Sequence, residues 1–315
     1  MKKSFWILCL FVGVSFAQSQ AHAWGKWGHA TVGQTAALLL DRDPTIEAKM
    51  LGSHSWGMGY YNNVPDIVWK SLPGKYPIER AEHFHDTEIF LREKTTDKLA
   101  NSRKEFEEKN KKVPLLAGRA LWRISELNEK LTQLTSKLKE NKAGKNLKKY
   151  QKTQGQWLSL AGVMGHYVAD LSQPLHCSEN YDGQLTGQKG LHAFFEEVLV
   201  DQLEPAVAGE VFVEAQKRWP KFKEENKALS VFELSQKLCS ESVGHLPEVL
   251  KVDKEVGRAD IAKAASAHKK LIVDRLALGS LYLAEIWRRQ LGWTYRGKKF
   301  YFFDHKPAYI RPGRR

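Results

Sequence analysis

Two pairs of histidine and carboxylate residues, each four positions apart, constrain the fold of this chain most strongly. His166 and Asp170 form the first pair, and His192 and Glu196 form the second. Residues four apart lie on one face of an α-helix, so each pair can direct both side chains to one ion. Imidazole and carboxylate groups are the ligands that zinc prefers where sulfur is absent. The spacing therefore predicts two helices that present metal ligands.

Apolar residues recur at helical spacing along most of the chain, whereas the alternation typical of strands is scarce. We expect helices at residues 28–40, 44–52, 114–141, 156–172, 191–203, 231–242 and 259–290. Pro174 should end the helix that carries His166, and the glycines of residues 178–190 indicate a loop before His192. Neither a repeat nor a linker divides the chain. The pattern predicts an all-α fold with a single helical domain.

The first 23 residues have the features of a secretory signal peptide. Lys2 and Lys3 precede an apolar run, and residues 21–23 read Ala-His-Ala, which matches an A-x-A cleavage site. The run is shorter than the ~18 to 20 residues that a membrane span needs, although an uncleaved anchor is the alternative. We expect residues 1–23 to be removed, residues 24–315 to form the exported protein, and its destination to be the periplasm or the medium.

The exported chain would be strongly basic and poor in cysteine. The formal charge of the whole chain is +13, and loss of Lys2 and Lys3 leaves +11. Such a surface favours polyanions, but the lysines of residues 137–152 could equally solvate a helix. The aromatic and basic residues of 295–315 could stack bases or pack on the domain. Only Cys177 and Cys239 remain, so at most one disulfide is possible.

Removal of the first 23 residues would expose the α-amine of Trp24, five residues before His29 in the run WGKWGH. A free α-amine and the carbonyl oxygen of the same residue can chelate one metal ion in a five-membered ring. The sequence therefore predicts a metal ligand that exists only after processing.

Together with PDIVW, EHFHD and HYVADLSQPLH, the WGKWGH run resembles a superfamily of zinc enzymes. This superfamily unites single-strand-specific nucleases of the P-one/S-one type with bacterial zinc-dependent phospholipase C. The motifs cover residues 24 to about 196, with a weaker helical likeness up to residue 291. The resemblance implies an all-α domain that holds three zinc ions at the bottom of a cleft.

The resemblance also implies nine zinc ligands in three sets, with Asp170 bridging two ions. The sets are Trp24, His29 and Asp170; Asp66, His83, His166 and Asp170; and His176, His192 and Glu196. Asp66 is also expected to act in catalysis, by orienting or deprotonating the attacking water. His85 matches no ligand position of the family.

Three further residues fall at substrate-binding positions of the nucleases. Phe84 would stack a base, and Asp86 would hydrogen-bond it, although a similar run also occurs in the phospholipases. The nucleases carry an arginine three residues after Asp66, where this chain has Trp69; Lys70 is the nearest replacement. A lysine ammonium cannot copy the bidentate contacts of a guanidinium.

The resemblance favours an exported endonuclease that hydrolyses single-stranded DNA and RNA, with 3'-nucleotidase activity as a further expectation. Its partners would be nucleic acid or nucleotides, with no stable protein partner. Glu196 and the short interval between His176 and His192 are closer to the phospholipases, so a phospholipase C that cleaves lipid head groups is the alternative. A second alternative is a non-catalytic exported protein that binds zinc.

Overall fold

The protein is described by a computed structural model that covers residues 24–43, 49–75, 79–95, 99–141, 146–296 and 307–313. These residues form an all-α fold, as predicted. They contain no β-strand, only an isolated antiparallel bridge between His85 and Gly118. The signal peptide expected at residues 1–23 lies outside the described residues.

The first half of the chain contains short helices followed by two long ones. They are α1 (Gly25–Asp41), α2 (Lys49–Ser53), α3 (Ser55–Asn62), the π-helix η1 (Pro65–Trp69), the 3₁₀-helix η2 (Arg80–Glu82), α5 (Thr87–Arg92), α6 (Arg103–Lys109), the 3₁₀-helix η4 (Leu115–Ala117), α7 (Ala120–Glu140) and α8 (Leu147–Ser172).

The second half begins with short turns and continues with longer helices. They are the 3₁₀-helices η5 (Pro174–Cys177) and η6 (Gln184–Thr186), α9 (Leu191–Ala193), the π-helix η7 (Phe194–Val198), α10 (Leu199–Leu203), α11 (Ala206–Asn226), α12 (Val231–Val243), α13 (Leu246–Val256) and α14 (Ile261–Arg289). No helix among the described residues combines the length and the apolarity that a membrane crossing requires.

Helices α1, α12 and α14 closely match the ranges predicted for them. Two predicted boundaries were wrong, because α8 begins at residue 147 rather than 156 and α7 begins at residue 120 rather than 114. The helix expected at 191–203 has the predicted bounds, but the π-helix η7 divides it. Most of the helix expected at 44–52 lies outside the described residues, and α3, α11 and α13 were not predicted.

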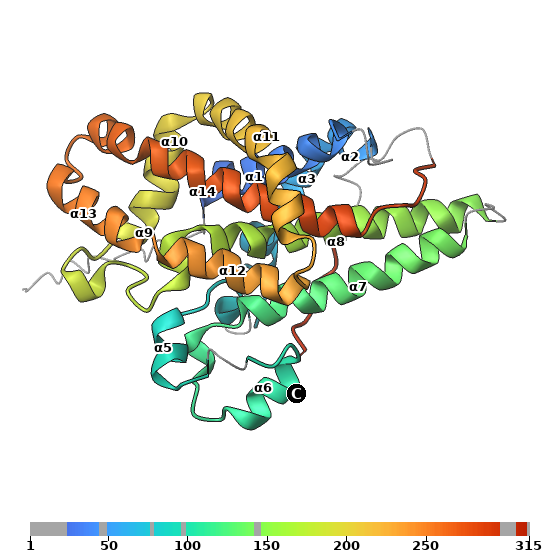
Figure 1. Cartoon of the computed structure of the whole chain (residues 1–315), viewed down its shortest axis with the longest axis horizontal. Coiled ribbons are helices and arrows are strands. Elements are labelled where there is room, and N and C mark those ends of the chain that lie inside the picture. Colours follow the sequence, from blue (N-terminus) through green and yellow to red (C-terminus); the bar gives the residue numbers. More distant parts are fainter. Residues whose placement is uncertain are drawn as a thin grey trace, which may run out of the picture.

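Helix α14 runs through the centre of the bundle and packs against α1, α8, α10 and α11 (Figure 1). Its apolar stripe is buried, and Leu276, Leu283 and Trp287 are fully enclosed. Burying such side chains is the main favourable contribution to folding. The stripe therefore forms the core, as its helical spacing predicted.

Helices α3 and α8 approach each other unusually closely. A Cβ atom added at Gly165 of α8 would lie 2.2 Å from Oδ1 of Asn62, and one at Gly162 would lie 2.4 Å from Cβ of Tyr61. Only glycine permits this approach, because any other residue would clash. The contact brings the end of α3 beside the buried half of α8, which carries His166.

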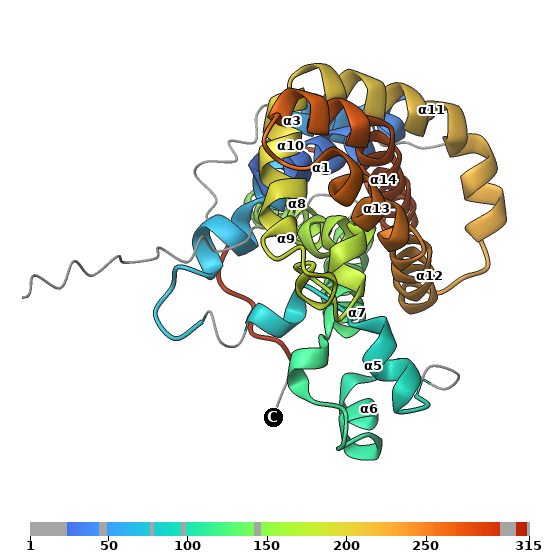
Figure 2. The ribbon, with the colours of Figure 1, turned by 90° about the vertical axis from the view of Figure 1, so that its left-hand side faces the viewer.

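Helices α5 and α6 form a smaller lobe on one side of the bundle, visible in both views (Figure 1, Figure 2). A disulfide between Cys177 and Cys239 joins η5 to α12, which settles the pairing that the sequence left open. Cys177 directly follows His176. The disulfide therefore anchors one candidate metal ligand to the bundle.

The C-terminal residues 307–313 lie across η1 and α7. Trp69 donates a hydrogen bond from Nε1 to the carbonyl oxygen of Pro307, and Arg123 donates one to the carbonyl of Ile310. Tyr295 and Tyr309 pack against the core. These two rings thus contribute to packing, whereas the aromatic residues 300–303 lie outside the described residues.

Candidate metal centre

Eight of the nine predicted ligands present side chains to one buried region, although they come from seven parts of the chain. They are His29 (α1), Asp66 (η1), His83 (after η2), His166 and Asp170 (α8), His176 (η5), His192 (α9) and Glu196 (η7). All eight are buried, and His192 is the most exposed, at 8%. The fold therefore gathers these residues into a single buried centre.

Two of the acidic residues lie on π-helical turns. Asp66 lies on η1, and Glu196 lies on η7. A π-turn widens the helix locally, which changes the direction of its side chains, and such turns are frequent at functional sites. The chain thus places both carboxylates with backbone geometry that an ordinary α-helix does not offer.

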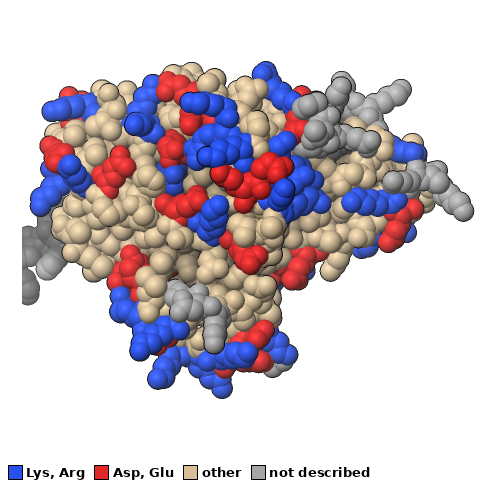
Figure 3. All heavy atoms as spheres, viewed as in Figure 1, with Lys and Arg blue, Asp and Glu red and all other residues tan. Residues whose placement is uncertain are grey.

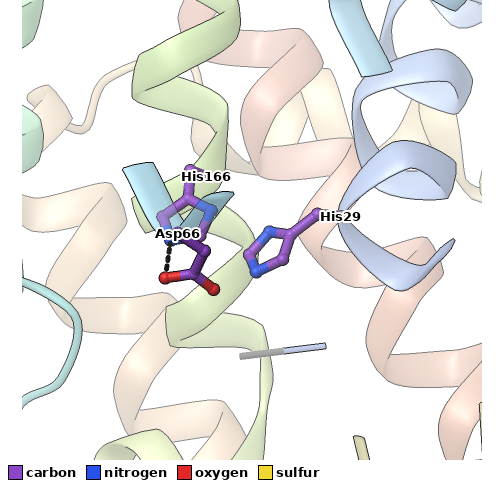
Figure 4. Close-up of side chains that lie close together, drawn as sticks. All are labelled: His29, Asp66 and His166. Atoms are coloured by element: carbon purple, nitrogen blue, oxygen red, sulfur yellow. Dashed lines mark ion pairs between the residues drawn. The ribbon is translucent and has the colours of Figure 1, made fainter. Parts of the chain in front are cut away.

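The first group consists of His29, Asp66 and His166, whose side chains point towards one another (Figure 4). One ligand atom from each lies within 4.8 Å of the others. The Nε2 atom of His166 lies 3.5 Å from Oδ1 of Asp66, and the rings of His29 and His166 stack with centroids 4.0 Å apart. Three donor groups thus face one small volume.

Asp170 lies between two sets of histidines and faces each with a different oxygen. Its Oδ1 atom lies 3.4 Å from Nε2 of His29. Its Oδ2 atom lies 2.9 Å from Nδ1 of His83 and 3.5 Å from Nε2 of His166. This arrangement is the one that a carboxylate bridging two ions requires.

The last group consists of His176, His192 and Glu196. The Nε2 atoms of the two histidines lie 3.1 Å apart. Oε2 of Glu196 lies 2.9 Å from Nε2 of His192 and 3.6 Å from Nε2 of His176. His192 and Glu196, the pair predicted from their four-residue spacing, therefore face each other even though Glu196 lies on the π-helix η7.

Backbone carbonyls fix the protonation of three of these imidazoles. Nδ1 of His166 lies 2.6 Å from the carbonyl oxygen of Asn62, Nδ1 of His176 lies 2.7 Å from that of His83, and Nδ1 of His192 lies 2.7 Å from that of Tyr181. A carbonyl only accepts, so each Nδ1 carries the hydrogen. In the neutral rings each Nε2 therefore directs a lone pair into the centre, as in metal-binding histidines.

These lone pairs make the centre suitable for cations. Two neutral imidazoles whose Nε2 lone pairs face each other at 3.1 Å repel, unless a proton or a metal ion lies between them. The measured distances of 2.9 to 3.6 Å in the last group also agree with ligands on one tetrahedral zinc. With metal–ligand bonds of ~2.0 to 2.1 Å, such ligands lie about 3.4 Å apart.

Several buried polar atoms of the centre also have no hydrogen bond. They are both ring nitrogens of His29, Nε2 of His83, Oδ1 of Asp170 and Oε1 of Glu196. Leaving buried polar atoms unpaired is costly, so they require a ligand. The buried histidine and carboxylate groups could therefore hold metal ions.

Burial strongly perturbs the titration of these groups. It lowers the pKa of His29 and His83 well below the ordinary value, and it raises the pKa of Asp170 well above, with Asp66 acting in the same direction. Burial also disfavours ionised Glu196, but His192 and His176 hold its pKa below the ordinary value. Neutral imidazoles are the form that binds a metal ion, whereas the Asp170 carboxyl must lose its proton when an ion binds.

Trp24, the ninth predicted ligand, lies beside this centre. Its indole Nε1 donates to the carbonyl oxygen of Ala169 and to Oγ of Ser172, which flank Asp170 on α8. Its ring packs against Phe195, next to Glu196. The indole of Trp24 is thus anchored among residues that neighbour Asp170 and Glu196 in the sequence. Its carbonyl oxygen accepts a hydrogen bond from the amide of Gly28 and keeps a second lone pair.

Sequence patterns gave no indication of two residues that orient the ligands. Asn62 accepts the Nδ1 hydrogen of His166 and donates from Nδ2 to the carbonyl oxygen of His29. Gln173 donates from Nε2 to Oε2 of Glu196. No periodicity singles out either residue, because their roles arise from contacts between distant segments.

The predicted substrate residues lie at the edge of the centre. Nζ of Lys70 lies 2.5 Å from Oδ1 of Asp66; burial acts to lower the pKa of the lysine, but the pairing with Asp66 outweighs burial and raises it. Phe84 is partly exposed, whereas Asp86 is 4% exposed. Burial, with Glu88 and Glu179 nearby, raises the pKa of Asp86 to about 8.

His85 does not join the ligand groups of the described residues. Its ring stacks on Phe90 with centroids 3.9 Å apart, and burial lowers its pKa to about 3. The neighbouring backbone is held by the bridge to Gly118, where a Cβ atom would lie 2.0 Å from the carbonyl oxygen of Phe84. The ring of His85 therefore contributes to the aromatic core that supports this segment of backbone.

Comparison with known proteins gives no match to a family model, to a curated protein or to a solved structure.

Proposed function

We propose that this chain is an exported zinc-dependent phosphodiesterase, an endonuclease that hydrolyses single-stranded DNA and RNA and also removes 3'-phosphates from nucleotides. The observation that carries the proposal is the carboxylate of Asp170, which faces histidine nitrogens with each of its two oxygens. Storage of metal needs no shared carboxylate, whereas catalysis on phosphate benefits from closely spaced cations. The resemblance of the motifs to zinc nucleases supports the same function.

Three sets of residues would hold zinc in this proposal. His29 and one oxygen of Asp170 would act with the amine and carbonyl of a processed Trp24, the other oxygen of Asp170 with Asp66, His83 and His166, and the last set is His176, His192 and Glu196. Bound zinc lowers the pKa of water from ~15.7 towards ~7 and offsets negative charge that develops on phosphate. Phosphodiesters need both effects, because attack adds charge to an anionic group.

Asp66 and Lys70 act at the reacting atoms in this proposal. The Lys70 ammonium lies against Oδ1 of Asp66 and keeps this carboxylate in a defined orientation. The Asp66 carboxylate would accept a proton from the attacking water and orient its lone pair. The buried ammonium of Lys70 also attracts the phosphate. In this role Lys70 takes the place of the arginine that the nucleases use.

The partly exposed ring of Phe84 favours nucleic acid as the substrate. An aromatic ring beside the ligands can stack an unpaired base, and stacking contributes about 1 to 3 kcal/mol per base. With its pKa near 8, Asp86 is protonated at neutral pH and can donate a hydrogen bond to a base. A duplex would have to fray before a base could reach this ring, so single strands react faster.

The test compares two substrates with protein that begins at Trp24. Hydrolysis of a single-stranded oligonucleotide and of phosphatidylcholine vesicles is measured before chelation, after chelation and after zinc is restored. The proposal predicts cleavage of the oligonucleotide, its loss on chelation and its recovery with zinc. The variant Asp274→Asn is the control, because Asp274 pairs with Arg218 and Arg275 outside the centre.

Each outcome separates the three candidate functions. Hydrolysis of the vesicles alone would establish the phospholipase alternative. Stoichiometric zinc with no hydrolysis of either substrate would establish a zinc-binding protein. Cleavage of the oligonucleotide that survives complete removal of metal would also contradict the proposal.

A further inference from the structure

The α7–α8 hairpin projects beyond the rest of the bundle and carries a concentration of lysine (Figure 1). We define the basic arm as residues 130–140 of α7 and 147–152 of α8. It contains six lysines and one glutamate, a net charge of 6 − 1 = +5: Lys130, Lys137, Lys139, Lys148, Lys149, Lys152 and Glu140. All six lysines are exposed, and the described part of this projecting end shows several blue patches with red beside them (Figure 3).

The lysines of the basic arm form no ion pair among the described residues. Lys109, Lys221 and Lys251, by contrast, each pair with a glutamate one helical turn away. Other exposed lysines, such as Lys217 and Lys263, are also unpaired in the described part of the chain, but the arm gathers six of them on one hairpin. Their charges therefore add to one positive field that attracts an anionic partner.

The apolar side chains of the hairpin are used inside it. Leu131, Leu138 and Trp157 are fully buried between α7, α8 and the chain after α14. Leu147 is the one large hydrophobic residue exposed on the described arm, at 50%. A helix that inserts into a lipid surface needs an exposed apolar face. The arm lacks such a face, which favours a hydrophilic polyanion over a membrane.

Helix α8 connects the basic arm to the metal centre without interruption. Lys149 and His166 are 166 − 149 = 17 residues apart on it, or about 25 Å at a rise of ~1.5 Å per residue. A nucleic-acid strand covers this distance with about seven phosphates at ~3.4 Å each. A long strand can therefore contact both places, whereas a dinucleotide cannot.

We propose that the basic arm binds the phosphate backbone of a nucleic-acid strand whose scissile bond lies at the metal centre. This inference rests on the proposed nuclease function and adds a second contact that captures long substrates. Contacts between lysine and phosphate do not depend on base sequence, and they release counterions. Affinity then falls as salt rises, with a logarithmic slope of about −0.7 per phosphate for single strands.

The test neutralises four arm lysines in the zinc-loaded protein. The variant carries Lys137→Gln, Lys139→Gln, Lys148→Gln and Lys149→Gln. Its control has the same net charge and carries Lys217→Gln, Lys254→Gln, Lys263→Gln and Lys270→Gln, at exposed positions on α11, α13 and α14. The value of kcat/KM is measured on an oligonucleotide of about 30 nucleotides and on a dinucleotide, between ~50 and ~200 mM salt.

The arm variant should lose about tenfold in kcat/KM on the oligonucleotide at low salt, and its salt slope should become shallower by up to about 3. Activity on the dinucleotide should match the wild type, and the control should keep both values. If the arm variant and the control behave alike on the oligonucleotide, the inference is wrong.

Binding measurements separate this inference from the proposed function. The probes are a phosphorothioate oligonucleotide of the same length, labelled for anisotropy, and vesicles that contain phosphatidylserine. Weaker oligonucleotide binding by the arm variant supports the inference, whether or not the wild type hydrolyses nucleic acid. Absence of hydrolysis by the wild type would refute only the proposed function. If the arm variant loses vesicle binding but keeps oligonucleotide binding, the inference that the arm binds nucleic acid is overturned.

Discussion

Nδ1 of His83 lies 2.9 Å from Oδ2 of Asp170, while the other oxygen of the same carboxylate faces His29 at 3.4 Å. Asp170 is fully buried, and burial raises its pKa well above the ordinary value. An ionised carboxylate is stable in such surroundings when cations lie on both sides. This relationship is the structural reason to expect two adjacent metal ions.

Replacing Asp170 with asparagine should remove metal from both sides of this carboxylate. Asparagine keeps the shape but lacks the negative charge, so we expect two zinc ions to be lost and hydrolysis to fall by at least about 100-fold. Elemental analysis of the purified variant measures the loss. Asp274→Asn is the control for the substitution itself, and full zinc content in Asp170→Asn would refute the bridging role.

Replacing Glu196 with glutamine should affect the last group selectively. Among the described residues, the carboxylate of Glu196 pairs with His176 and His192 and accepts a hydrogen bond from Gln173. We expect about one zinc per chain to be lost and the other two to remain. The neighbouring variant Glu197→Gln is the matched control. Equal loss of all zinc in Glu196→Gln would show that the three groups bind as a single unit.

The two candidate metal-binding pairs could be predicted from sequence because their arrangement depends on local geometry. His166 with Asp170, and His192 with Glu196, need only a helical turn to face one ion. Pro174 also ended α8 close to the expected residue, since proline lacks the amide that the helix requires. Where neighbours in the sequence determine structure, the pattern was sufficient.

Other parts of the fold depend on contacts that the pattern does not contain. Helix α11 includes Gly209 and Pro220, which argue against a helix locally. It nevertheless forms, because Val211, Ala215 and Trp219 are buried in the bundle, where α11 packs on α14. The polar start of α8 was missed for the same reason, since its partner α7 stabilises it.

The orientation of the ligands was also beyond the sequence. Asn62 reaches both His29 and His166 because α3 and α8 approach at Gly165. The π-helical turns at Asp66 and Glu196 likewise reflect packing around the centre. Four-residue spacing identified Glu196 as a candidate and the family resemblance identified Asp66, whereas tertiary contacts determine where their oxygens point.

Removing the disulfide should destabilise the protein and weaken the group that contains His176. Cys177 and Cys239 are 62 residues apart, and a disulfide typically contributes about 2 to 4 kcal/mol to stability. The double variant Cys177→Ser, Cys239→Ser should unfold at a lower denaturant concentration and lose zinc from this group to a chelator first. Unchanged stability and unchanged zinc release would contradict this expectation.

Asp86 should make stability depend on pH. Its pKa is about 8 in the folded chain, against an ordinary value of 3.8. Between these values the unfolded chain releases a proton that the folded chain retains, so this residue lowers stability as pH rises from about 4 to about 8. An asparagine side chain does not titrate, and one pKa unit corresponds to about 1.4 kcal/mol.

The variant Asp86→Asn should therefore be more stable than the wild type at pH 8, by at least about 1 kcal/mol, and the difference should disappear near pH 4. Denaturant unfolding at both pH values measures it. Because the remaining groups titrate alike in both proteins, only Asp86 contributes to the difference. Parallel stability profiles across this range would show that Asp86 ionises normally.

The number of zinc ions per chain, measured by native mass spectrometry on protein that begins at Trp24, tests the central claim most directly. We predict three ions, and two for a chain with one residue added before Trp24, because the extension converts its amine into an amide. Absence of stoichiometric zinc from the processed protein would contradict the metal centre. An equal count in both proteins would contradict the role of the α-amine.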